Sequence, residues 1–313
     1  MKYVLTVTLN PSLDRMITVD HLTMGKEFDI DQEIFSAGGK GLNVSRALKG
    51  LHTKTFCTGL LGGETGRLIQ TLLRKEGIRG DFLKIQGLTR VNLSIKDLAS
   101  NKQTRFLDLG PKVSSARIEA FKKKYLRLLK QSSLVVLSGR NAHGAPLNLY
   151  ADLVRLAHQK NIEVIVDTHD KPLELAIQAK PLLIKPNLNE LEGLLHQRLN
   201  TKVKMKKAIQ ELHKKGARLV LLSLGKDGAI LSNQEEIWMA RPPAVKFLND
   251  VGCGDTMVAG FIYGYLKGLS LKDILCFSVA AGTANAMEAI PGFIHLDQVK
   301  GVLKRVKVHQ MRA

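Results

Sequence analysis

Residues 249–260 read Asn-Asp-Val-Gly-Cys-Gly-Asp-Thr-Met-Val-Ala-Gly. Here Gly252 and Gly254 flank a small residue, and Asp255 begins an apolar run that predicts a helix as far as Leu266. Glycine adopts backbone angles closed to other residues and lets a ligand approach the main chain. The free N–H groups and the positive dipole end of the helix would point into the turn. The stretch predicts an anion site with a carboxylate at its edge. An ordinary glycine turn before a helix accounts for the pattern equally well.

Length and charge limit the classes of protein to consider. The chain has 313 residues, enough for one large α/β domain or two smaller ones. Its formal charge of +19, from 47 basic and 28 acidic residues, attracts anions of any kind, including phosphorylated metabolites. The basic runs lie inside helix-like stretches, which favours solvated helix faces over a nucleic-acid groove. Aromatic residues are only 5% of the chain, and none alternate with these runs, so a stacking platform for nucleic acid is not indicated.

Cysteine usage and hydropathy bear on the compartment. Cys57, Cys253 and Cys276 are too far apart to suggest a metal cluster or a disulfide framework, which is typical of a reducing cytoplasm. The longest uncharged stretch, 274–287, is shorter than the ~20 residues that a membrane span needs. We therefore expect a cytoplasmic protein with no membrane segment.

Strands and helices alternate along most of the chain. Buried strands are predicted at 3–9, 55–60, 134–137, 162–166, 182–184 and 219–223, and a hairpin at 229–239. Helices are predicted at 37–51, 64–75, 114–130, 146–159, 171–177, from 187 and at 203–214, and two more after Asp255 close the chain. This alternation predicts an α/β fold with a mostly parallel central sheet covered on both faces. Four short, exposed strands, within about 12–36 and 88–109, predict a small β-sheet lid inserted in a single domain covering 1–313.

Three segments could together supply phosphoryl transfer, which needs positioning, charge neutralisation and a base for the attacking hydroxyl. The turn at 252–254 offers N–H donors, and Asp255 could accept the hydroxyl proton. Just past a strand end, Lys185 could neutralise a phosphate and Glu190 could hold Mg²⁺ through water. Asn187 and Glu190 also fit a helix N-terminal capping box. The Gly-Lys-Asp-Gly turn within 223–231 could wrap a nucleotide's phosphates or be a plain hairpin turn.

Two further segments could meet a substrate. Asp14 follows the first strand, at an edge where α/β sheets bind ligands, although a turn residue there is also common. The run Ala37-Gly-Gly-Lys-Gly opens a helix and brings Lys40 and Asn43 to its start. A lysine beside free backbone N–H groups suits a phosphate or a sugar hydroxyl. The alternative is a flexible turn with a solvated lysine.

Six segments together resemble the ribokinase-like PfkB sugar kinases, and most closely their phosphosugar branch, the 1-phosphofructokinases and tagatose-6-phosphate kinases. In order they are TLNPSLDR from Thr8, GGKGLNVSR, TRVNLSI, IKPNLNEL, SLGKDGA and VGCGDTMVAG. Each is weak alone, but all six occur in the family's order over nearly the whole chain. The resemblance implies a ribokinase-like three-layer α/β/α domain with a β-sheet lid that often pairs two subunits. It also implies ATP and Mg²⁺.

The resemblance also implies a role for each matching position. Asp255 would be the catalytic base, with Gly252, Cys253 and Gly254 as the anion hole. Lys185, Asn187 and Glu190 would serve Mg²⁺ and phosphate. Nucleotide contacts would come from Ser223, Gly225, Gly228, Asn249 and Asn285. The sugar would be held by Asp14, Gly39, Lys40, Asn43 and Ser138, and its existing phosphate by Arg90.

The chain departs from the family around the expected sugar pocket. Ser-Gly-Arg-Asn-Ala at 138–142 stands where Ser-Gly-Ser-x-Pro is usual, and Asp-Thr-His-Asp at 167–170 where Asp-Thr-Ser-Gly is usual. Near Thr104, Arg105 and Leu107 replace a usual Glu and Asn. Arg140 could add a phosphate contact or merely fill a surface turn. Cys253 could be a small filler or a point where oxidation blocks the anion hole.

The leading hypothesis is an ATP-dependent kinase of a ketohexose phosphate, converting fructose 1-phosphate to fructose 1,6-bisphosphate. Within the enzyme class the alternatives are a tagatose-6-phosphate kinase and then a ribose or nucleoside kinase. From another class, a non-catalytic sugar-phosphate-binding protein would also explain the altered turns. Nucleic-acid binding is not favoured, because the basic residues are dispersed.

Overall fold

The first strand, β1 (Tyr3–Thr8), is rich in β-branched and apolar residues and lies inside a large sheet. The computed structural model describes residues 2–30 and 32–311, and in them this sheet has ten strands in the order β14-β13-β12-β11-β10-β9-β8-β1-β4-β5. From β5 to β11 neighbouring strands are parallel, and from β11 to β14 they are antiparallel. The other members are β4 (Thr55–Gly62), β5 (Leu83–Ile85), β8 (Ser132–Ser138), β9 (Val164–Asp167), β10 (Leu183–Ile184), β11 (Leu219–Ser223), β12 (Ala229–Ser232), β13 (Ile237–Arg241) and β14 (Lys307–Gln310).

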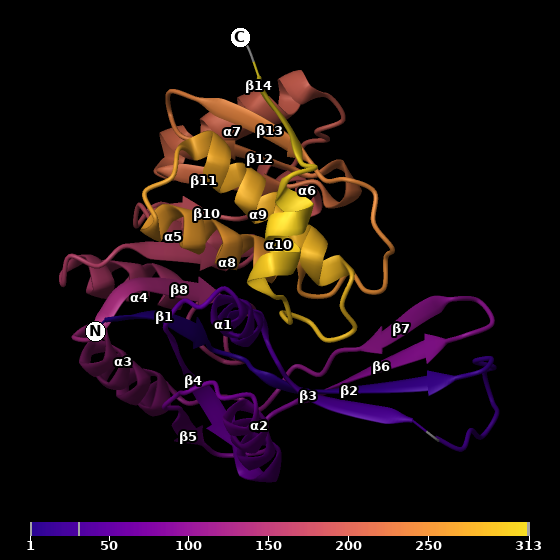
Figure 1. Ribbon diagram of the computed structural model, residues 1–313. Coiled ribbons are helices and arrows are strands. Elements are labelled where there is room, and N and C mark those ends of the chain that lie inside the picture. The colour runs from indigo at the N-terminus through magenta and orange to yellow at the C-terminus, as the bar shows by residue number, and fades with distance from the viewer. Residues whose placement is uncertain (1, 31, 312–313) are drawn as a thin grey trace.

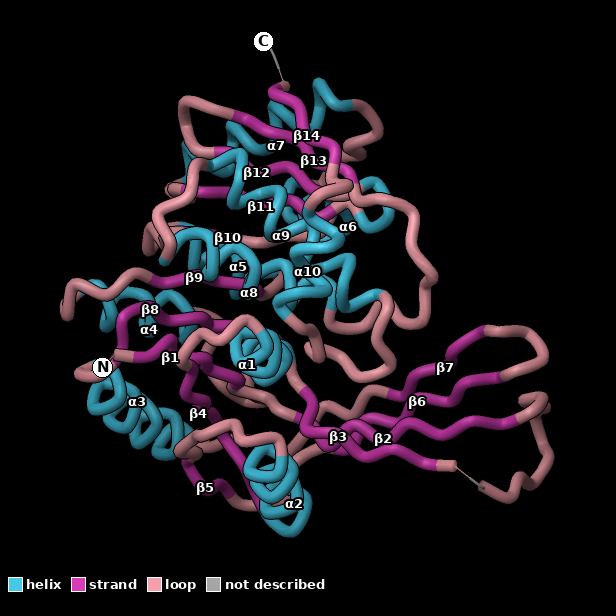
Figure 2. Tube along the Cα trace, viewed as in Figure 1, coloured by secondary structure: helices cyan, strands magenta, loops and turns pink. Residues whose placement is uncertain are grey.

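Helices cover both faces of this sheet, as Figures 1 and 2 show. One face packs against α1 (Lys40–Gly50), α8 (Cys253–Leu266), α9 (Leu271–Ala286) and α10 (Leu296–Leu303). The other packs against α3 (Ser115–Leu129), α4 (Leu149–His158), α5 (Asp170–Ile177), α6 (Leu188–Leu195) and α7 (Lys202–Lys215). The strands alternate between the two cores: Leu134 and Val136 of β8 face the first group of helices, Val135 and Leu137 the second. The ribokinase-like three-layer fold is thus confirmed.

A second sheet extends from one side of the body (Figure 1). It has four strands in the order β3-β2-β6-β7, namely β3 (Glu33–Gly38), β2 (Ser12–Val19), β6 (Val91–Asp97) and β7 (Lys102–Phe106). Where the small sheet joins the body, α2 (Gly63–Lys75) packs against both, since its Ile69 and Leu73 form a small third core with Leu13 and Leu61. The predicted small sheet is therefore present and is separate from the large one.

The structure differs from the sequence prediction at the chain's end and at one edge. The two predicted helices, α8 and α9, do not close the chain, because α10 and β14 follow them. The strand β14 pairs with β13 at the sheet edge and is mostly exposed, so its sequence lacks the apolar pattern of a buried strand. At the other edge β5 has only three residues, too few to show a period.

Candidate active site

The glycine turn at 252–254 forms the N-terminus of α8, as predicted. Gly252 is the N-cap residue with φ 83°, a left-handed conformation that favours glycine. A Cβ on Gly252 would come within 3.0 Å of the Gly292 nitrogen, so the turn is also packed too closely for a side chain. The N–H groups of the first helical turn therefore have a fixed direction. This makes the turn fit to bind an anion.

Asn285, which the sequence placed beside the nucleotide, supports this turn from within the protein. Its side chain is fully buried. Its Nδ2 donates to the carbonyl of Val251 at 2.8 Å and contacts the Cys253 sulfur at 3.4 Å, while its Oδ1 accepts from the N–H of Gly292 at 2.7 Å. Both ends of the Asn285 amide therefore contact the protein itself, and we infer that Asn285 stabilises the glycine turn.

Asp255 lies in the first turn of α8 and is buried. Its Oδ2 accepts a hydrogen bond of 2.8 Å from Nδ2 of Asn43, at the start of α1. Burial, together with the charge of Asp167, raises the pKa of Asp255 to about 7, although Lys40, Asn43 and Lys185 oppose the rise. A carboxylate with a pKa near neutrality can both take up and release a proton at neutral pH, as a general base must.

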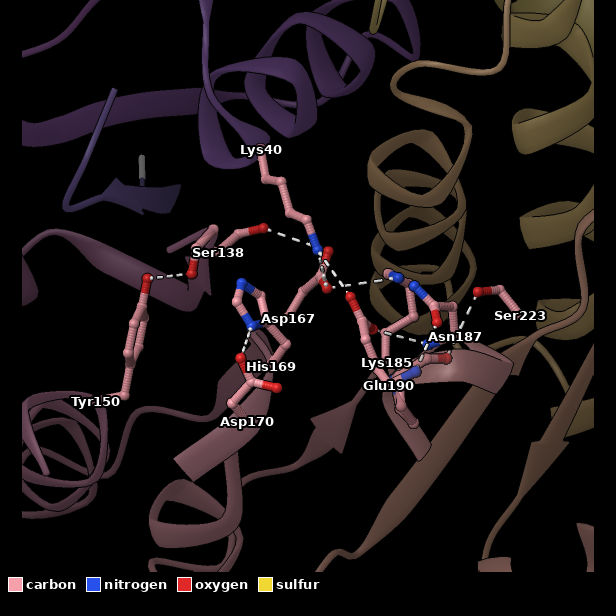
Figure 3. A network of polar contacts seen from close by, with 12 residues as sticks. Lys40, Ser138, Tyr150, Asp167, His169, Asp170, Lys185, Asn187, Glu190 and Ser223 are labelled. Carbon is pink, nitrogen blue, oxygen red and sulfur yellow. Dashed lines mark hydrogen bonds and ion pairs between the residues drawn. The ribbon is translucent and has the colours of Figure 1, made fainter. Parts of the chain in front are cut away.

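Asp167 occupies the centre of the site, and the sequence analysis did not include it among the site residues. It is the last residue of β9 and fully buried. Its Oδ1 lies 3.0 Å from Nζ of Lys40 and 3.4 Å from Nζ of Lys185 (Figure 3). Burial alone would raise the pKa of Asp167, but the two lysines hold it below its ordinary value. A carboxylate at the carboxyl end of a buried parallel strand was the signal that could have identified it.

The two lysines bring positive charge to the glycine turn. Burial would lower the pKa of Lys40, but Asp167, Glu190 and Asp255 raise it above its ordinary value, so Lys40 is charged. A Cβ on Gly254 would lie 3.2 Å from Nζ of Lys185, so this ammonium group sits against the turn. The space at the turn thus combines backbone N–H donors with two cations, a setting suited to phosphate oxygens.

Asn187 and Glu190 form the capping box that was the structural alternative for this pair. The Asn187 side chain accepts from the N–H of Glu190, and the Glu190 carboxylate accepts from the N–H of Asn187, both at 2.8 Å. The second oxygen of Glu190 points toward Lys40, 3.7 Å away. The capping box therefore also fixes a carboxylate at the edge of the phosphate space (Figure 3).

The residues expected to meet the nucleotide begin at the end of β11. Ser223 forms an isolated parallel β-bridge with Asn187, and this backbone contact joins the segment to the capping box. Gly225 begins a short 3₁₀ turn with φ 58°, and the space beside its Cα is open. Gly228 has φ 94°, and a Cβ there would collide with the carbonyl of Ala240. Asn249 holds the loop before the glycine turn, since its Oδ1 accepts from the N–H of Val251 at 3.0 Å.

Several residues expected to hold the sugar lie near the start of β2, where the small sheet joins the large one. Ser12 and Asn92 both donate to Oδ1 of Asp14, at 2.6 and 2.9 Å, and thereby orient its carboxylate. Gly39 has φ 123°, and a Cβ there would come within 2.7 Å of the Thr8 side chain. Asn43, expected to touch the sugar, instead contacts Asp255 directly, and Arg46 donates to its oxygen at 3.0 Å.

Arg90 and Ser138 are both buried. The Arg90 guanidinium donates to the carbonyls of Asn10, Pro11 and Asp108 at 2.9–3.3 Å. These bonds use one N–H on each nitrogen, so each terminal nitrogen keeps a second N–H. Burial and the nearby charge of Arg140 lower the pKa of Arg90. The hydroxyl of Ser138 lies 3.4 Å from Asp167 and belongs to the same polar network.

Cys253 is the first helical residue of α8, where a helix dipole would favour a thiolate. Burial outweighs this effect and raises the pKa of the Cys253 thiol to about 11. The thiol is therefore protonated at neutral pH, which favours its interpretation as a small filler.

One ion pair joins the small sheet to the loop before the glycine turn. Nη2 of Arg105, on β7, lies 2.7 Å from Oδ1 of Asp250. The Asp250 carbonyl in turn accepts from the N–H of Cys253 at 3.4 Å. The residue that replaces a usual family glutamate thus reaches the beginning of the anion turn.

Fold and site together are those of a phosphotransferase: a buried aspartate stands beside a helix N-terminus and two lysines, at the carboxyl ends of parallel strands. Residues 8–289 match the pfkB family of carbohydrate kinases, and the chain belongs to this family.

Relatives of known activity agree with this assignment. The chain is 34% identical to the tagatose-6-phosphate kinase of Staphylococcus epidermidis over 308 residues, which cover 97% of this chain and 99% of that protein. It is 34% identical to the 1-phosphofructokinase of Borreliella burgdorferi over 313 residues, covering 98% of each. The crystal structure of phosphofructokinase-2 from Escherichia coli in complex with potassium matches with a TM-score of 0.92 at 29% identity, covering 97% of this chain and 99% of that one. The protein is thus an ATP-dependent kinase of a sugar phosphate.

Proposed function

We propose that the protein phosphorylates fructose 1-phosphate to fructose 1,6-bisphosphate, with ATP as donor. The observation that carries this proposal is the position of Asp255, buried beside the anion turn with a pKa raised to about 7. In the reaction a sugar hydroxyl attacks the γ-phosphorus of ATP, the bond to the β-phosphate oxygen breaks, and ADP leaves. Asp255 accepts the hydroxyl proton. The N–H groups at 252–254 hold the charge on the transferred group.

Lys40 and Lys185 would keep the phosphates in place. Both are oriented by Asp167, so they do not have to be immobilised when the nucleotide binds. Mg²⁺ would accompany the nucleotide, since Mg²⁺ is usually held by one or two carboxylates, water and substrate phosphates. Glu190 fits this need, because the capping box fixes its carboxylate at the edge of the phosphate space. The ion would screen charge on the transferred phosphoryl group.

Arg90 and Arg140 would bind the phosphate that the substrate already carries. Burial lowers the pKa of Arg90; the charge of Asp14 opposes this and the charge of Arg140 adds to it, so Arg90 feels both neighbouring charges. Within the described residues the acceptors of Arg90 are neutral carbonyls, and no ion pair is found for Arg140. The phosphate of the substrate could take the free N–H on both terminal nitrogens of Arg90.

A sugar panel tests this proposal. ADP release is measured with fructose 1-phosphate, fructose 6-phosphate, tagatose 6-phosphate, ribose and free fructose. We expect the highest kcat/KM for fructose 1-phosphate. A higher value for tagatose 6-phosphate would favour the alternative suggested by the S. epidermidis relative. The change Arg90→Ala should raise KM for phosphosugars far more than for free sugars, and an equal rise for both would refute its phosphate role.

We also propose that two copies of the chain pair through the small sheet in a reducing cytoplasm. The apolar side chains of Ile34, Phe35, Val91 and Phe106 on this sheet are exposed. A tetrameric form of E. coli phosphofructokinase-2 has been described, so members of this fold do associate. Cys57, Cys253 and Cys276 are free thiols, as expected for that compartment. In the described residues no helix is long and apolar enough to cross a bilayer. Light scattering should give the dimer mass, and a monomer that persists at high protein concentration would contradict the pairing.

A further inference from the structure

His169 lies next to the centre of the site, and the mechanism above does not use it. It follows the buried pair Asp167 and Thr168 at the carboxyl end of β9 and precedes α5. Figure 3 shows its ring on the side of Asp167 that faces Ser138, below Lys40. About 30% of its side chain is exposed, so the ring can meet a ligand.

Asp170 orients this ring. Its carboxylate lies 2.6 Å from Nδ1 of His169. Asp170 itself has φ 57°, in the left-handed region, which glycine adopts more readily than any residue with a side chain. A glycine there would remove the carboxylate. The chain thus adopts an unfavourable backbone conformation at Asp170, whose side chain holds the ring of His169.

The contact with Asp170 determines what the other ring nitrogen can do. A carboxylate accepts hydrogen bonds, so Nδ1 of His169 carries the proton that it donates to Asp170. In the neutral ring Nε2 is then an acceptor. Among the described residues Nε2 has no hydrogen-bond partner, whereas its neighbours are engaged: Lys40 with Asp167, and Tyr150 with the carbonyl of Gly139 at 2.9 Å.

We propose that Nε2 of His169 accepts a hydrogen bond from a hydroxyl of the sugar substrate, and that His169 is a specificity-determining residue. This inference rests on the proposed function, since it requires a sugar beside Lys40 and Ser138. A hydroxyl can donate to a neutral imidazole. A fully ionised phosphate oxygen only accepts, so it would need a second proton on the ring. A sugar hydroxyl can donate to Nε2 of the neutral ring or accept from it in the protonated ring, so a hydroxyl suits this nitrogen in either state, and the place of the ring beside Lys40 and Ser138 points to one.

Calorimetric binding, without turnover, tests the inference. The ligands are fructose 1-phosphate, its analogues that each lack one hydroxyl, and inorganic phosphate. For the wild type we expect one analogue to bind about three- to tenfold more weakly than the parent, as for loss of one neutral hydrogen bond. In His169→Ala the parent should weaken by the same factor, and the preference over that analogue should vanish. Gln accepts through its side-chain oxygen, so His169→Gln should restore part of it.

Two further variants separate a ligand contact from a structural role. Asp170→Gly accepts φ 57° without strain, and this gain offsets the greater freedom of the unfolded chain, so its melting temperature should stay close to that of the wild type. It should nevertheless lose part of the preference, because the ring is no longer oriented. His309→Ala, on the exposed strand β14, is the matched control and should bind every ligand as the wild type does.

Unchanged binding of fructose 1-phosphate by His169→Ala would overturn the inference, as would equal weakening of the parent and all deoxy analogues. Weaker binding of inorganic phosphate alone would place His169 on the phosphate and overturn it too. The proposed function fails separately. It is refuted if the wild type binds the phosphosugar but releases no ADP, a result that leaves the role of His169 in binding intact.

Discussion

Replacing Asp255 by Asn should have opposite effects on activity and stability. The change keeps the size of the side chain, and an asparagine oxygen can still accept from Nδ2 of Asn43, which now lies 2.8 Å from Oδ2. It removes the proton acceptor. Loss of a positioned general base costs roughly 10²–10⁴ in rate, so kcat for ADP release should fall by that factor. KM should change little, because the new asparagine would keep the contacts of the ground state.

The stability effect follows from the raised pKa of Asp255. An unfolded aspartate ionises near its ordinary pKa of 3.8, whereas Asp255 in the fold ionises near 7. Between these values the folded state binds the proton that the unfolded state has released. The contribution of Asp255 to the free energy of unfolding therefore falls as pH rises from about 4 to about 7 and is constant above that. The full difference corresponds to at most about 4 kcal/mol.

The neutral side chain of the Asp255→Asn variant would not carry this cost. The variant should unfold with nearly the same free energy as the wild type at about pH 4 and be more stable by up to about 4 kcal/mol at pH 8. Urea denaturation without ligand at both pH values measures this difference. The control is Asp297→Asn, whose side chain is 99% exposed and which should show no such pH dependence. Turnover within tenfold of the wild type would refute the base, and equal stability changes at both pH values would refute the buried charge.

Three more predictions concern the anion turn and the lid. Gly254→Ala should lower kcat by about ten- to a hundredfold with little change in melting temperature. The new Cβ would lie 3.2 Å from the present position of the Lys185 ammonium group and would displace it. Unchanged kcat in the sugar assay would contradict this. Arg105→Ala and Asp250→Ala should each raise KM severalfold at low salt and have little effect at high salt. The reason is that the ion pair between the small sheet and the glycine turn is exposed, so salt screens it. Additive effects on KM in the double variant would exclude the pairing. Peroxide should not inactivate the enzyme through Cys253, because the thiol, with its pKa raised to about 11, stays protonated. If peroxide inactivates the wild type but not Cys253→Ala, this prediction is wrong.

Local patterns in the sequence were sufficient to predict the α/β class, the strands of the small sheet and the glycine turn at the start of α8. Periodicity and glycine placement act over a few residues, so they can be read without the fold. The pattern at 252–255 predicted the helix start with Asp255 in its first turn, and both are present. By contrast, β14 and β5 were missed, because an exposed edge strand and a three-residue strand carry little periodicity.

The tertiary structure decided which groups meet and which charge each one carries. Asp167 and Asp255 are far apart in the chain, yet the first acquires a lowered pKa and the second a pKa near 7. Parallel strands bring Asp167 and Lys185 to one edge of the sheet, and Lys40 reaches the same edge from the start of α1. Asn285 and Asn43 resembled ligand-binding residues, and the fold also gives their amides partners within the protein, in the turn and in Asp255. Such assignments depend on distance and burial, which no local pattern in the sequence contains.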